Sequence, residues 1–158
     1  MTKALGKDAT CSIARCLDVV GDTWTLLIIR DALITGSTRF QDFRDALGIA
    51  SNILTARLAR LVDDGLMERR TYQEPGSRQR DEYVLTEAGR SLSAVIAALS
   101  DWGRTHRPAP DGTSPQFTTE GTGRRTRLAF VTDDGDEVSP AQLVARRTPD
   151  NALAAPTA

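Results

Sequence analysis

The sequence predicts an α+β fold in which several short helices are followed by a β-hairpin and a long helix. Between residues 11 and 65, apolar residues recur at helical spacing in four segments that each end near a glycine. Two strand-like stretches then flank a turn containing Pro75 and Gly76. Apolar residues recur again over residues 86–106, as in an amphipathic helix.

Two helices are expected first. Residues 11–20 carry apolar side chains at helical spacing, and Gly21 ends this helix because glycine tolerates the left-handed conformation. Residues 22–36 form the second helix, which Asp22 or Thr23 can cap.

Residues 40–47 and 51–65 predict two more helices joined by a tight turn, with Ser51 as the N-cap of the second. Leucines at positions 54, 58 and 61 give this second helix one apolar stripe. Its flanks and opposite side carry small, polar and basic residues: Asn52, Thr55, Ala56, Arg57, Ala59 and Arg60. This is the helix-turn-helix layout, in which the second helix fits the major groove of DNA.

Residues 66–74 and 81–86 predict the two strands of a hairpin with a basic tip. Over residues 69–80 there are four arginines against one glutamate, a local charge of +3 in a chain whose net charge is −1. A basic hairpin next to a helix-turn-helix is typical of the wing of a winged-helix domain.

Residues 86–106 predict one long helix that starts at Thr86, although Gly89 replaces the Glu or Gln of a full capping box. Its apolar stripe is expected to pair with a second copy of the chain. We therefore expect N- and C-terminal dimerisation helices. The stripe comprises Leu92, Val95, Ile96, Leu99 and Trp102.

The predicted organisation has four parts. Residues 1–107 form the winged helix-turn-helix and dimerisation domain, and residues 108–123 form a linker rich in Pro, Gly, Ser and Thr. Residues 124–147 form a small β-hairpin extension with Asp134-Gly135 as its turn. Residues 148–158 are expected to be disordered.

The composition gives little support for an enzyme. The chain has two cysteines and one histidine, His106, so neither a zinc site nor a nucleophile–histidine site is expected, and no phosphate-binding glycine loop is present. We expect no catalytic residue, metal or cofactor. No apolar run approaches the roughly 20 residues that cross a bilayer, and the N-terminus does not resemble a secretory signal, so we expect a cytoplasmic protein that does not contact membranes.

Residues 11–102 resemble the HxlR-type winged-helix regulators, relatives of the MarR type. The resemblance rests on CSIARCLDVVGDTWTLLIIRDAL, TRFQDFRDALGIASNILTARLARLVDDGLMERR, DEYVLTEAGRSL and the later DWG. It implies a dimeric DNA-binding repressor or activator that responds to electrophiles, oxidants or small ligands. The chain departs from the family pattern in having Ser12 where Pro often follows the N-terminal cysteine. It also has no cysteine after Cys16, which argues against a metal ribbon in the extension.

Several residues are candidates for contact with double-stranded DNA. Asn52 can hydrogen-bond adenine, and Arg57 or Arg60 can bind guanine or phosphate. The alternative is an exposed helix face whose arginines pair with nearby aspartates. The full predicted set is Arg39 as a phosphate clamp, Ser51, Asn52, Thr55, Ala56, Arg57 and Arg60 on the second helix, and Arg78 and Arg80 in the wing.

Three further residues are candidates for regulation. Cys11 lies near a helix start, where the helix dipole favours a thiolate that oxidants or electrophiles could modify; the alternative is a buried hydrophobe. Cys16 is expected to point elsewhere. Trp24 and Trp102 could line a small-molecule effector pocket or belong to the core or dimer interface.

The sequence thus predicts a sequence-specific DNA-binding transcriptional regulator that acts as a homodimer. We expect a repressor rather than an activator, and a response to a small ligand or to thiol oxidation or alkylation. The alternative is a winged-helix protein-interaction module that does not bind DNA, and the basic wing argues against it.

Overall fold

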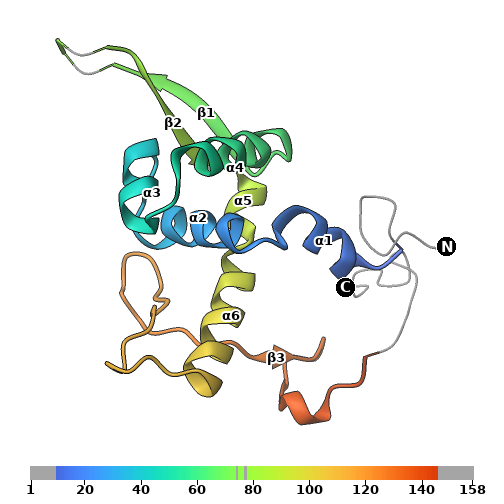
Figure 1. Cartoon of the computed structure of the whole chain (residues 1–158). Coiled ribbons are helices and arrows are strands. Elements are labelled where there is room, and N and C mark those ends of the chain that lie inside the picture. Colours follow the sequence, from blue (N-terminus) through green and yellow to red (C-terminus); the bar gives the residue numbers. More distant parts are fainter. Residues whose placement is uncertain (1–9, 74, 77, 146–158) are drawn as a thin grey trace. The chain divides into compact units, whose positions relative to one another are not determined.

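The computed structural model describes residues 10–73, 75–76 and 78–145 (Figure 1). The chain forms two compact units, divided between Pro115 and Gln116. This division falls inside residues 108–123, the predicted linker. The tail predicted at residues 148–158 lies outside the described residues.

The first unit begins with helices α1 (Ser12–Val20) and α2 (Thr23–Ile34). The side chain of Asp22 accepts a hydrogen bond from the Thr25 amide at 3.1 Å, so the predicted cap of α2 is confirmed. Ile28 and Ile29 of α2 are fully buried, which places this helix at the centre of the core.

Helices α3 (Phe40–Leu47) and α4 (Ser51–Asp63) form the predicted helix-turn-helix. Gly48 between them has a φ of +60°, a backbone conformation that residues other than glycine rarely adopt. The expected N-cap role of Ser51 is wrong, because Ala50 is the N-cap and Ser51 already has helical geometry. The start of α4 is instead fixed by burial of the neighbouring Ile49 and of Leu54.

Strands β1 (Met67–Tyr72) and β2 (Arg80–Leu85) pair antiparallel, from Met67 opposite Leu85 to Tyr72 opposite Arg80. The hairpin extends away from the helices, as Figure 1 shows. The Thr38 carbonyl accepts the Tyr83 amide at 2.7 Å, which fixes the hairpin beside the start of α3. This arrangement is a winged helix-turn-helix, and the α+β prediction is confirmed.

The predicted single helix over residues 86–106 is wrong in one respect, because it is interrupted at Leu92. It consists of α5 (Glu87–Ser91) and α6 (Ser93–His106). Gly89 lies against the backbone of the chain before β1: a Cβ there would be 2.1 Å from the Leu66 carbonyl oxygen. We attribute the interruption to the packing of α5 against this carbonyl. Helix α6 then begins after Leu92.

The second unit contains a small antiparallel hairpin, β3 (Phe130–Val131) and β4 (Glu137–Val138), followed by a 3-10 turn, η1 (Pro140–Gln142). Gly135 in the connecting turn has a φ of +89°, as the Asp-Gly turn signal predicts. Arg127 and Glu137 form a bidentate ion pair beside this hairpin. No helix among the described residues is long and apolar enough to span a bilayer.

Candidate nucleic-acid interface

The outer face of α4 is exposed and carries small residues, both polar ones and alanines. Leu54, Leu58 and Leu61 are buried on the opposite side. Asn52, Thr55 and Ala56 are exposed, as are Ser51 and Ala59. The Thr55 hydroxyl donates its hydrogen to the Ser51 carbonyl at 2.8 Å, so it can bind a further group only by accepting a hydrogen bond. The face presents little bulk, which suits close approach to a base-pair edge.

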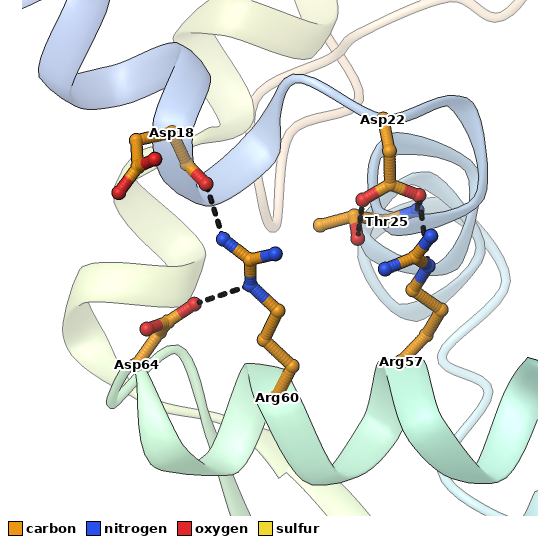
Figure 2. Close-up of polar contacts among 6 residues, drawn as sticks. All are labelled: Asp18, Asp22, Thr25, Arg57, Arg60 and Asp64. Atoms are coloured by element: carbon orange, nitrogen blue, oxygen red, sulfur yellow. Dashed lines mark hydrogen bonds and ion pairs between the residues drawn. The ribbon is translucent and has the colours of Figure 1, made fainter. Parts of the chain in front are cut away.

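Arg57 points toward the start of α2 rather than outward with Asn52. Its Nε lies 3.1 Å from Oδ1 of Asp22, and the side chain is about one-third exposed. Figure 2 shows this guanidinium beside the carboxylate that caps α2. Partial burial raises the pKa of the Asp22 carboxyl, but hydrogen bonds from Thr25 and the charge of Arg57 outweigh it, so this pKa lies below its usual value.

Arg60 is directed to the same side of α4. Its guanidinium donates to the backbone carbonyl of Asp18 in α1, and its Nε lies 3.4 Å from Asp64 (Figure 2). The contact with Asp64 is the aspartate pairing that the sequence left open as the alternative for this helix. The contact with Asp18 connects α1 to α4 and could not be inferred from spacing, since these residues are 42 positions apart.

A groove lies between the start of α3 and the wing. It has a volume of about 640 Å³, and its lining includes Arg39, Gln41, Tyr72 and Arg80. The guanidinium carbon of Arg39 lies 4.7 Å from the centre of the Tyr72 ring, a cation–π contact. Sequence reasoning identified Arg39 but missed Tyr72 and Gln41, because only the docking of the hairpin brings them to one groove.

The arginines of the wing (β1, β2 and the turn between them) fall into two groups. Arg69 lies 3.7 Å from Asp81, and Arg70 lies 3.0 Å from Glu68, so their charges are partly compensated. The side chains of Arg78 and Arg80 are exposed and form no ion pair or hydrogen bond with the residues that the structure describes.

The candidate regulatory residues are not brought together. Cys11 and Cys16 are both exposed, and Cys11 is the N-cap residue of α1. Trp102 is 58% exposed and the centre of its ring lies 5.0 Å from that of His106, whereas Trp24 is half-buried. Neither tryptophan lines a cavity that the structure reveals between α2 and α6. The part of the chain that is described contains no group of three potential metal ligands.

A family model described as HxlR-like helix-turn-helix matches residues 19–111, more than half of the chain. The chain belongs to the HxlR-like family. The match runs from the end of α1 through α6, and therefore covers the helix-turn-helix and the wing.

Two relatives of this HxlR-like chain illustrate the similarity. An HTH-type transcriptional regulator of Mycobacterium tuberculosis is 45% identical over 101 residues, which are 64% of this chain and 62% of the relative. The regulator YdeP of Bacillus subtilis is 34% identical over 102 residues, or 64% and 77% of the two chains. The HxlR-like chain thus spans less than two-thirds of the length of the mycobacterial relative.

Solved structures agree with the fold. PA1607, a candidate transcription factor, is 38% identical with a TM-score of 0.76, and the alignment covers 90% of this chain and 98% of PA1607. The redox regulator HypR in its reduced form is 32% identical with a TM-score of 0.55, over 61% of this chain and 94% of HypR. The similarity to PA1607 therefore extends beyond the family match into the second unit.

Proposed function

We propose that this protein is a transcriptional regulator that binds double-stranded DNA in a sequence-specific manner as a homodimer, and that it is not an enzyme. The observation that carries the proposal is the exposed outer face of α4 beside a wing that presents Arg78 and Arg80. In a dimer, two α4 helices would enter successive major grooves about 34–36 Å apart. The names of the relatives support the same role.

The placement of the arginines divides the interface into two tasks. Asn52 and its small neighbours on α4 read base edges, because no long side chain on that face holds the helix away from the groove. Arg78 and Arg80 contact phosphates or the minor groove, and Arg39 contacts a phosphate next to Tyr72. Arg57 and Arg60 hold α4 against α1 and α2, so their contribution to DNA binding is to position α4.

Self-association is supported by apolar side chains left exposed on two helices. Ile13 and Leu17 of α1 are 68% and 49% exposed, and Leu99 and Trp102 of α6 are 51% and 58% exposed. Within each helix the two residues are neighbours at helical spacing, and exposed apolar side chains that lie together mark an interaction surface. We propose that a second copy covers them.

Repression and regulation complete the proposal. The direction of control that we propose is repression, by a dimer that occupies its DNA site and excludes other proteins from it. The similarity to the redox regulator HypR and the exposed position of Cys11 at the start of α1 favour a response to oxidants or electrophiles, alongside the response to a small ligand.

The proposal is tested by fluorescence anisotropy with duplexes from promoter regions, including the one upstream of its own gene, and with random duplexes. Wild-type protein should prefer one genomic duplex by roughly a thousandfold or more. Asn52→Ala should reduce that preference by about 5- to 150-fold. Arg80→Ala should weaken binding to all duplexes alike. It should also reduce the slope of log affinity against log salt concentration by about 1.

Arg125→Ala is the matched control, since Arg125 is an exposed arginine of the second unit. It should change neither the preference for the genomic duplex nor the salt dependence of binding. If the wild-type protein bound no duplex even at low ionic strength, the proposal would be overturned. Equal losses on specific and random DNA for Asn52→Ala would contradict the assignment of base reading to α4.

A further inference from the structure

A cavity of about 340 Å³ lies between α2, α6 and residues 107–115, all within the first unit. Its walls are largely apolar and include Leu26 of α2 and Ile96 and Leu99 of α6. This volume is at the lower end of the range for small-molecule sites, roughly 300–1,000 Å³. The cavity is therefore large enough for a small organic molecule.

Three arginines also line the cavity, and they differ in how their charges are compensated. Arg30 Nη2 lies 2.7 Å from Asp31, and Arg104 pairs with Asp101. The side chain of Arg107 forms no ion pair or hydrogen bond with the described residues. The cavity thus combines an apolar wall with one uncompensated guanidinium, which complements a molecule that has an apolar body and a negative charge.

Gly103 supports the view that this space is used. Glycine is unfavourable inside a helix, and close packing explains its presence at Gly89, where a Cβ would meet the Leu66 carbonyl. At Gly103, in the interior of α6, a Cβ would meet no atom within 4 Å. Gly103 lines the cavity, so any larger side chain at this position would take up part of its volume.

We propose that this cavity binds a small amphipathic carboxylate, with its apolar body between Leu26 and Ile96 and its carboxylate paired with Arg107. As the site of the ligand response this inference rests on the proposed function, although binding itself requires no DNA. The effector site thus lies away from Trp24 and Trp102, the two residues that the sequence offered for it.

Isothermal titration of the full chain with octanoate and with benzoate tests the site. At least one of them should bind saturably with one site per chain, and the matching neutral amide should bind about tenfold or more weakly. Arg107→Gln should weaken carboxylate binding by a similar factor, while the matched control Arg125→Gln should leave it unchanged. Gly103→Leu should abolish binding without lowering the melting temperature, because leucine favours helix and its Cβ meets no atom within 4 Å.

Four results would overturn the proposal. Absence of binding of both carboxylates at millimolar concentration would exclude this ligand class, and so would equal binding of acid and amide. Unchanged carboxylate binding by Gly103→Leu would place the ligand elsewhere. If Gly103→Leu disrupted a dimer in sedimentation and no carboxylate bound, the space would belong to the contact between two copies.

The same preparations are then titrated with duplex DNA. Carboxylate binding without any DNA binding would refute the proposed function and leave the site intact, whereas DNA binding without carboxylate binding would refute the site alone.

Discussion

Arg57 of α4 and Asp22, the N-cap of α2, form an ion pair with 3.1 Å between Nε and Oδ1. The same carboxylate accepts the Thr25 amide and hydroxyl. One acidic side chain therefore holds both the start of α2 and the flank of the helix proposed to read DNA. Arg57 Nε is buried and has no aligned hydrogen-bond acceptor among the described residues, so its charge depends on Asp22.

Asp22→Ala should lower the free energy of unfolding by about 1–2 kcal/mol. The substitution removes a helix cap and leaves the partly buried Arg57 without its counter-charge. Urea denaturation followed by circular dichroism measures the change. Asp45→Ala is the control, since Asp45 is exposed, and it should stay within about 0.5 kcal/mol of wild type. Equal losses for the two variants would contradict a special role for Asp22.

The lowered pKa of Asp22 predicts how this contribution depends on pH. The folded state binds a proton at Asp22 less readily than the unfolded chain, whose ordinary pKa is 3.8. The stabilisation is therefore fully present above pH 3.8 and is lost as the pH falls through the lowered folded-state pKa. Asp22→Asn retains a capping side chain, so its stability should converge with that of wild type in acid. A difference that stays constant across the pH series would argue against the ionised carboxylate as the cause.

Two glycines should respond to alanine with opposite signs. Gly89→Ala should destabilise the protein by about 1–3 kcal/mol, because the new Cβ would be 2.1 Å from the Leu66 carbonyl oxygen. Gly103→Ala should stabilise it by about 0.5–1 kcal/mol, because alanine favours the helix and meets no atom within 4 Å. The denaturation midpoints of the two variants, compared with that of wild type, measure these changes. Shifts of both midpoints in the same direction would be inconsistent with the packing described.

Trp102→Glu should weaken self-association by at least tenfold, because a charge would replace a large apolar side chain in the proposed dimer interface. Val131→Glu provides a matched control in the second unit, since Val131 is 59% exposed and Trp102 is 58% exposed. Sedimentation equilibrium over a concentration series measures the dimer constant. An unchanged constant for Trp102→Glu would remove α6 from the interface.

Cys11 should react with N-ethylmaleimide faster than Cys16. Both thiols are exposed, but only Cys11 lies at the N-terminus of α1, where the helix dipole favours the thiolate. Cys11→Ser and Cys16→Ser each leave one thiol, and mass spectrometry of timed samples gives the two rates. Faster labelling of Cys16 would count against the proposed sensing role of Cys11.

Much of the fold was determined by the sequence because its signals are local. Helical spacing of apolar residues predicted α1 to α4, and alternation around Pro75-Gly76 predicted the wing. The Asp22 cap and the Asp-Gly turn were predicted for the same reason, since both the side chain and the backbone groups it serves lie within a few residues. The outer face of α4 also follows from spacing, because burial of its leucines leaves Asn52 on the opposite side.

Only the tertiary structure decided where the long basic side chains point and where cavities form. Arg57 and Arg60 could have faced outward by spacing alone, but the docking of α1 and α2 brings Asp22 and the Asp18 carbonyl within their reach. The break at Leu92 and the cavity at Gly103 likewise depend on segments distant in sequence. A flexible side chain takes the conformation that its charged neighbours favour, and those neighbours are known only once the helices have packed.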